Sequence, residues 1–205
     1  DKPIIAYSIE AALETGLFDH VVVSTDDEEI ADISRQLGAE VPFIRPKELA
    51  DDFTGTGPVT EHAIQWFIKN GQPAEYGCCI YATAPFIKAR YLLEGWDKLV
   101  NSGKDFVFSV TTYPFPIQRS LRINQYGCME IVSQEDFPKR SQDLEEMYHD
   151  AGQFYWGKAE SFGKMSMHGV SLPLLLPRWL VQDIDTEEDW RRAELMYQAM
   201  HLRVE

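Results

Sequence analysis

The chain has 205 residues, of which 44% are apolar and 25% charged, and this composition excludes a disordered or fibrous protein. The length predicts a single domain that spans residues 1–205. Nineteen basic and 33 acidic residues give a net charge of −14, which argues against binding of nucleic acid or anionic lipid. A small polyanionic substrate would then need a divalent cation between its phosphates and the carboxylates of the protein.

The most hydrophobic stretch, 172–181, is interrupted by Pro173, Pro177 and Arg178, so it is not a membrane span. The chain has three cysteines, two of them adjacent in a predicted strand, where they are poorly placed to bridge each other. No signal-peptide pattern is present. We therefore expect structural thiols and a cytoplasmic location.

Helical and β-branched patterns alternate along the first half of the chain. The predicted order is helix 3–15, strand 20–25, helix 26–37, short strand 40–44, helix 58–69, strand 76–83, helix 88–101 and strand 105–111. This order predicts an α/β fold with a doubly wound, mostly parallel sheet.

The pattern changes after Pro114, because 121–123 and 129–132 alternate around a turn as the two arms of a hairpin would. We interpret residues from about 114 to 150 as an inserted flap, after which the aromatic stretch 152–156 returns to the sheet. A hairpin with no core of its own must bury its apolar face elsewhere, so the flap is expected to contact a second copy.

The end of the chain is predicted to form a last strand within 172–185 and then a helix capped by Thr186. Asp183 and Asp185 flank Ile184, and the two-residue period of an extended chain turns both carboxylates to one side. Such a pair suits Mg²⁺ held together with substrate phosphates. A pair of acids stabilised by the helix dipole is an equally open alternative.

Asp26 and a group of basic residues in the flap are further candidates. Asp26 also follows a predicted strand, but it opens an acidic helix start, so a capping role is favoured there. Arg140 belongs to a group of basic residues in the flap, together with Arg119, Arg122 and Lys139. This group fits either an anionic substrate or a solvated cluster of charges.

Five stretches together resemble one family, the cytidylyltransferases that activate nonulosonic acids, known as the CMP-sialic acid synthetase family. They are STDDEEIA (24–31), RPKELADD (45–52), IYATAPF (80–86), KRSQDLEEMYHDAGQFYW (139–156) and LVQDIDTEEDW (180–190). Their joint occurrence in this order is more specific than any one motif. Within the family, Tyr81 and Asp150-Ala151-Gly152 resemble the pseudaminic acid branch, whereas the sialic acid branch has a Gln and an NGA-type sequence there.

The resemblance implies transfer of CMP from CTP to the anomeric hydroxyl of a nine-carbon acid sugar, with release of pyrophosphate and with a flap that pairs two subunits. Asp183 and Asp185 match the family's Mg²⁺ carboxylates. The residues expected to contact the nucleotide are Arg45, Thr56 and Asp26. Those expected to line the sugar pocket are Tyr81, Thr83, Asp150, Gln153, Phe154 and Tyr155, with Arg140 on the sugar carboxylate.

Members of this family begin with a strand and a basic, glycine-containing loop for the triphosphate, and Asp1 matches a position downstream of that loop. We therefore expect about twenty residues, including a first strand, to be absent, and the chain as given to be inactive or nearly so. The alternatives are a non-catalytic sugar- or nucleotide-binding relic, and a cytidylyltransferase for sialic or legionaminic acid. A phospho-receiver module is disfavoured, because Tyr81-Ala82-Thr83 stands where an acceptor Asp would be needed.

Overall fold

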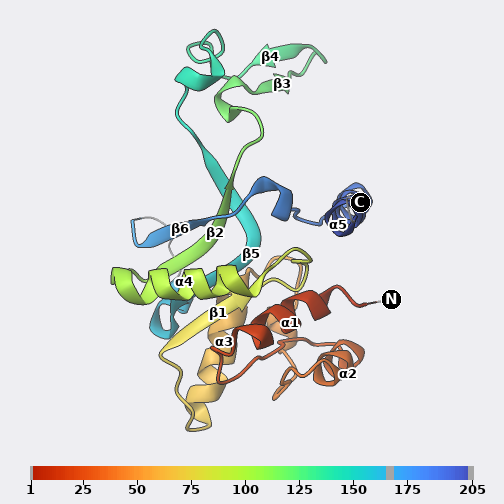
Figure 1. Cartoon of the computed structure of the whole chain (residues 1–205), viewed down its shortest axis with the longest axis vertical. Helices are drawn as coiled ribbons and strands as arrows, with labels where there is room; N and C mark the ends of the chain where they lie inside the picture. Colours follow the sequence, from red (N-terminus) through yellow and green to blue (C-terminus); the bar gives the residue numbers. More distant parts are fainter. Residues whose placement is uncertain (1, 165–168, 203–205) are drawn as a thin grey trace.

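The structure is a computed structural model that describes residues 2–164 and 169–202. Its centre is a four-stranded sheet in the order β1-β5-β2-β6 (Figure 1). The strands are β1 (Tyr76–Ile80), β2 (Phe106–Thr112), β5 (Tyr148–Lys158) and β6 (Ser171–Leu175). Because β6 runs parallel to β2, and β5 antiparallel to both β1 and β2, three strands point one way. The predicted mostly parallel sheet is confirmed, with β5 as the reversed strand.

Helices cover both faces of the sheet, which confirms the doubly wound prediction (Figure 1). On one face lie α1 (Ile5–Thr15), α4 (Ala89–Ser102) and α5 (Glu187–His201). On the other lie α3 (Thr56–Lys69) and the 3₁₀ segment η4 (Ala159–Lys164). The remaining helix, α2 (Glu28–Gln36), packs beside α1. Gly16 and Gly103 are the C-caps of α1 and α4, and both have the left-handed backbone conformation that is common at helix ends.

Alternation along β5 assigns its side chains to the two faces. Phe154 and Trp156 enter the main core, where the Trp156 indole N–H donates to the carbonyl of Leu92 on α4 at 3.0 Å. Gly95 lets α4 approach this closely, since a Cβ there would lie 2.8 Å from Trp156 Cδ1. Tyr155 faces the α3 side, where its register partner Cys79 also lies.

Four predicted elements differ from the structure. The segments 20–25 and 40–44 are not regular strands; they meet in one parallel bridge, between Val22 and Glu40. A strand gains its stability from a ladder of neighbours, and a single bridge supplies little of one. Helix α3 begins at Thr56 instead of Pro58. The stretch 179–185 forms the 3₁₀ turn η5 (Arg178–Leu180) and irregular chain, because Pro177 ends the strand pairing and starts the turn.

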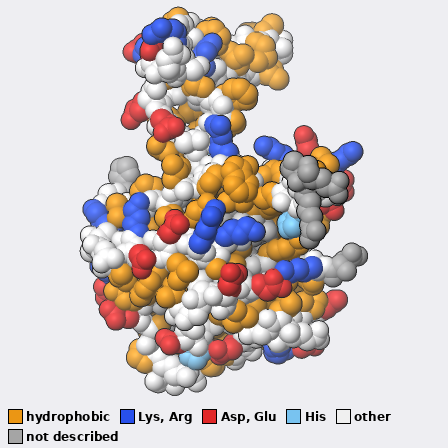
Figure 2. Space-filling view, viewed as in Figure 1, with side chains coloured by type: hydrophobic (Ala, Val, Ile, Leu, Met, Phe, Trp, Pro, Cys, Tyr) orange, Lys and Arg blue, Asp and Glu red, His pale blue; other side chains and the backbone are white. Residues whose placement is uncertain are grey.

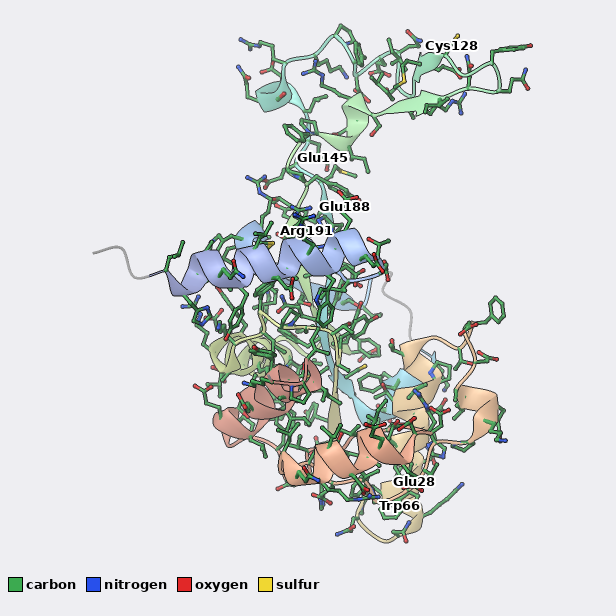
Figure 3. The ribbon with its side chains drawn as sticks, turned by 90° about the vertical axis from the view of Figure 1, so that its right-hand side faces the viewer. Glu28, Trp66, Cys128, Glu145, Glu188 and Arg191 are labelled. Atoms are coloured by element: carbon green, nitrogen blue, oxygen red, sulfur yellow. The ribbon has the colours of Figure 1, made fainter. Side chains whose placement is uncertain are left out.

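The flap contains the predicted hairpin, β3 (Leu121–Ile123) and β4 (Met129–Ile131), with the 3₁₀ turns η2 (Ile117–Arg119) and η3 (Ser141–Asp143). Figure 1 shows that the flap projects from the domain on the extensions of β2 and β5. Figure 3 places Cys128 at its far end and Glu145 at its base. Large apolar side chains are exposed on it, among them Ile123 at 71% and Met129 at 62%, and Figure 2 shows hydrophobic atoms on this lobe.

Candidate functional site

Asp183 and Asp185 stand on the loop between η5 and α5. The cap of α5 is a complete capping box: the Asp189 N–H donates to Thr186 Oγ1 at 3.2 Å, and the Thr186 N–H donates to Asp189 Oδ2 at 3.0 Å. The predicted near capping box is confirmed. In the part of the chain that the structure describes, the capping hydrogen bonds therefore do not use the side chains of Asp183 and Asp185.

The electrostatics around Asp183 are unfavourable for its charge. Partial burial raises the pKa of this carboxyl above its ordinary value, and the negative charge of Asp185 raises it further, with a smaller contribution from Asp150. None of the ion pairs formed by residues 2–164 and 169–202 includes Asp183 or Asp185. A bound cation would relieve this repulsion.

The donor set fits a cation that also takes ligands from a substrate. Among the described residues, no group of three or more His, Cys, Asp or Glu side chains could hold a metal ion. Mg²⁺ commonly binds one or two protein carboxylates together with phosphates and water, and so needs no larger cage. Two carboxylates with hard oxygen atoms, without a cationic partner among the described residues, match that chemistry.

Three of the predicted sugar-pocket residues come together beside β5. The Tyr155 hydroxyl donates to Asp150, and the rings of Tyr81 and Tyr155 lie with centroids 5.7 Å apart. Burial raises the pKa of Tyr155 well above its ordinary value, and its hydrogen bonds with Asp150 and Tyr81 add to this, so the phenol stays neutral. The Tyr81 backbone is anchored by Ser8, whose hydroxyl donates to the Tyr81 carbonyl at 2.6 Å.

The neighbouring Gln153 and Phe154 are occupied by the fold. Gln153 is 3% exposed, and its side-chain amide donates to the carbonyl of Leu180. Phe154 is 0% exposed and belongs to the main core. The prediction that Phe154 lines the sugar pocket is therefore wrong. Phe154 and Trp156 are two residues apart in β5, so both side chains point to the α4 face of the sheet, away from Tyr155. This spacing can be read from the sequence.

Of the three predicted nucleotide contacts, Arg45 and Asp26 form a second group. Arg45 donates through Nη2 to Asp26 Oδ1 at 3.3 Å, while its Nε is buried without a hydrogen-bond partner in the described chain. Asp27, and not Asp26, caps α2 by accepting from the Ile30 N–H. Thr56 is the first residue of α3. The hydrogen bonds and ion pairs of the described residues join Arg45 to Asp26 but do not join this group to Asp183.

Two predicted substrate residues lie apart from these groups. Thr83 is exposed on the turn after β1. Arg140 stands on the flap, is 72% exposed, and donates to both carboxylate oxygens of Asp143 at 2.7 and 3.0 Å. Lys139 and Arg122 also pair with acids of the flap. These pairs favour the solvated-charge interpretation, and the structure does not bring Arg140 to the other pocket residues.

A surface hollow of about 330 Å³ opens at the start of α4, where it is lined by Lys88, Arg90 and Trp179. None of the predicted site residues lines it. The clustered polar groups around Asp183, and not this hollow, mark the candidate site. None of the helices within residues 2–164 and 169–202 is long and apolar enough to cross a membrane.

Comparison with known proteins identifies the relatives of this chain. A family model described as cytidylyltransferase matches residues 1–163. A pseudaminic acid cytidylyltransferase of Campylobacter jejuni is 38% identical over 202 residues, which cover 98% of this chain and 87% of that protein. The N-acylneuraminate cytidylyltransferase of Escherichia coli is 27% identical, over 94% of this chain and 45% of that protein.

Solved structures agree in fold. A CMP:2-keto-3-deoxy-manno-octonic acid synthetase complexed with CTP matches with a TM-score of 0.64 at 16% identity, over 97% of this chain and 89% of that chain. A 4-diphosphocytidyl-2C-methyl-D-erythritol synthase from Anaerococcus prevotii matches with a TM-score of 0.63 at 13% identity, over 95% and 89%. At these identities the likeness shows the shared architecture.

Proposed function

The chain belongs to the cytidylyltransferase family, and from this premise we propose that it transfers CMP from CTP to the anomeric hydroxyl of pseudaminic acid, with release of pyrophosphate. The observation that carries the proposal is the 38% identity to a protein named pseudaminic acid cytidylyltransferase, over 98% of this chain. The relative named for N-acylneuraminate is more distant, at 27% identity. Pseudaminic acid is therefore favoured over sialic acid as the acceptor.

Asp183 and Asp185 are the residues proposed to hold Mg²⁺. What supports this is that burial of the Asp183 carboxyl and the negative charge of Asp185 raise the pKa of Asp183, and that none of the described ion pairs includes either residue. When bound, the cation would neutralise charge on the triphosphate and on the departing pyrophosphate. The contribution of the two side chains is to fix its place against the substrate, since positioning accounts for much of the rate of such transfers.

The acceptor sugar is proposed to contact the cluster of Tyr81, Asp150 and Tyr155. Tyr155 stays protonated and donates its one hydroxyl proton to Asp150, so its oxygen can accept a hydrogen bond from the sugar but does not serve as a base. Tyr81 offers a phenol whose ring rests against Tyr155 and whose backbone is anchored at both ends, by Ser8 and by the Gln153 carbonyl at 2.9 Å. A ring fixed in this way can discriminate between sugars that differ in shape and in hydrogen-bonding groups.

The experiment is a product assay with CTP, Mg²⁺ and one acid sugar at a time: pseudaminic, N-acetylneuraminic or legionaminic acid. It is run on the chain as given and on the chain extended by the N-terminal segment expected from the family's sequence pattern. We expect the extended chain to form CMP-pseudaminate and pyrophosphate in equal amounts, and the chain as given to form little or none. A higher kcat/KM with either of the other sugars would overturn the substrate assignment, and consumption of CTP with no sugar nucleotide formed would overturn the reaction.

A homodimer through the flap is proposed as the functional assembly, in the cytoplasm where CTP is available. The exposed pair Ile123 and Met129, opposite each other in the hairpin, supports this, because such an apolar surface is costly to leave in water. Sedimentation should show a dimer that Ile123→Lys converts to a monomer. Phe53→Lys, which changes an apolar residue that is 94% exposed outside the flap, is the control and should remain dimeric. A monomeric unmodified chain at high micromolar concentration would contradict the assembly.

A further inference from the structure

Strand β5 contains a large bulge opposite β2. The register pairs Phe108 with Tyr155 and Val110 with Asp150, so Ser109 alone faces residues 151–154. The Ser109 hydroxyl closes one end of the bulge: it accepts from the Phe154 N–H at 3.1 Å and donates to the Phe154 carbonyl at 3.3 Å. Because Ser109 is fully buried, these bonds replace part of the interrupted ladder.

Asp150 closes the other end. Its Oδ1 accepts from the Gly152 N–H at 2.8 Å, and its Oδ2 accepts from the Tyr155 hydroxyl. One carboxylate therefore spans the bulge and fixes both its turn and the strand beyond it. The two oxygens are engaged by neighbours on the same strand, which is the arrangement of a structural clamp.

The bulge touches the chain that carries the two aspartates at two points. The Gln153 side-chain amide donates to the Leu180 carbonyl, which fixes the start of that segment. Gly152 has a φ of 60° and lies so close that a Cβ built on it would be 3.3 Å from Asp183 Oδ1 and 3.5 Å from Asp183 Cγ. A side chain at Gly152 would have to displace the carboxylate by a few tenths of an ångström.

We propose that this bulge is a positioning element for Asp183. Because Gly152 has no side chain, it leaves room for the Asp183 carboxylate. The hydrogen bonds that Asp150 accepts from Gly152 and Tyr155 hold the bulge in shape. The inference rests on the proposed function, in which Asp183 holds a divalent cation. Metal ligation tolerates displacements of only about 0.2–0.5 Å, so a shift of the expected size affects binding.

The first test compares Gly152→Ala with Gly103→Ala by titrating the chain with Mn²⁺ alone and measuring free Mn²⁺ by electron paramagnetic resonance. Both glycines have φ near 60°, at 60° and 66°, but a Cβ at Gly103 meets no atom within 4 Å. The two variants therefore share the backbone strain and differ in the contact with Asp183. We expect Gly152→Ala to raise the Mn²⁺ Kd about tenfold, as outer-shell changes at metal sites commonly do, and Gly103→Ala to leave it unchanged.

A second pair of variants keeps the test open should Gly152→Ala fold poorly. Tyr155→Phe removes only the hydroxyl that donates to Asp150. Tyr148→Phe, its control, removes a hydroxyl that donates to Glu146 at 2.7 Å on the exposed side of the same strand. We expect Tyr155→Phe to raise the Mn²⁺ Kd several-fold and Tyr148→Phe to leave it unchanged, with thermal midpoints measured on all four proteins.

The same variants separate positioning from sugar contact. A positioning role for Tyr155 predicts that Tyr155→Phe raises the Mg²⁺ concentration for half-maximal turnover, whether or not the KM for the sugar also changes. A change in the sugar KM alone would overturn the positioning role and leave only the sugar contact. Asp183→Asn separates the two proposals. If it weakens Mn²⁺ binding while folded Gly152→Ala and Tyr155→Phe bind like their controls, the positioning role is overturned and the metal site stands. If it leaves Mn²⁺ binding unchanged, the metal site fails and the positioning role fails with it.

Discussion

The assignment of Phe154 to the core gives a sharp prediction, because the resemblance would have placed this residue in the sugar pocket. Phe154 is fully buried against α4, where a Cβ on Gly95 would lie 3.0 Å from its ring. Phe154→Ala leaves a cavity that α4 cannot fill without moving, and we expect a loss of about 3–5 kcal/mol in the free energy of unfolding. For a domain of this size that corresponds to a fall of roughly 6–20 °C in the thermal midpoint.

The assay is urea unfolding followed by circular dichroism, together with the ratio of kcat/KM for pseudaminic and N-acetylneuraminic acids. Phe53→Ala makes the same change at a site that is 94% exposed, and should cost less than about 0.5 kcal/mol. Phe154→Leu retains most of the buried volume and serves if the alanine variant does not fold. A loss below about 1 kcal/mol on Phe154→Ala, accompanied by a changed sugar ratio, would refute the core assignment.

Three further predictions concern the pocket, the cap of α5 and the thiols. Tyr81→Gln should change the ratio of kcat/KM between pseudaminic and N-acetylneuraminic acids; an unchanged ratio would remove Tyr81 from the pocket. Thr186→Ala breaks the capping box and should cost about 1 kcal/mol of stability in thermal unfolding, and a stability equal to the parent would contradict that geometry. Cys128 is exposed and should react with a thiol reagent at once. Burial raises the thiol pKa of Cys78 and of Cys79, so these two should react only on unfolding. Fast reaction of all three thiols would contradict the packing around β1.

Much of the fold could be predicted because local patterns fix it. Apolar periodicity and capping residues placed the five α-helices of residues 2–164 and 169–202 within a few residues of their observed ends, and the alternating arms 121–123 and 129–132 predicted the flap hairpin. The direction of β5 could not be read in the same way. A strand that follows a helix is constrained to run parallel, but β5 follows the flap, and nothing in its own sequence selects between the two directions.

The candidate site was predictable where a residue's role follows from its local spacing. Asp183 and Asp185 could be paired from the period of an extended chain. Ser109 and Gly152 were missed as site residues, because their roles depend on a register shift between two strands far apart in sequence. A glycine within a strand pattern indicates a bulge, so Gly152 carried a signal, but its contact with Asp183 needs the tertiary structure.

The central claim is that Asp183 and Asp185 hold the cation needed for CMP transfer. The most direct test measures kcat and the thermal midpoint for Asp183→Asn and Asp185→Asn in the N-terminally extended form. Asparagine keeps the size but loses the charge, so each variant should lower kcat by a factor on the order of 10² or more while the thermal midpoint changes little. A loss of about 0.3–1 kcal/mol in stability with turnover nearly intact would instead show a pair of acids that only favours the start of α5, and would contradict the claim.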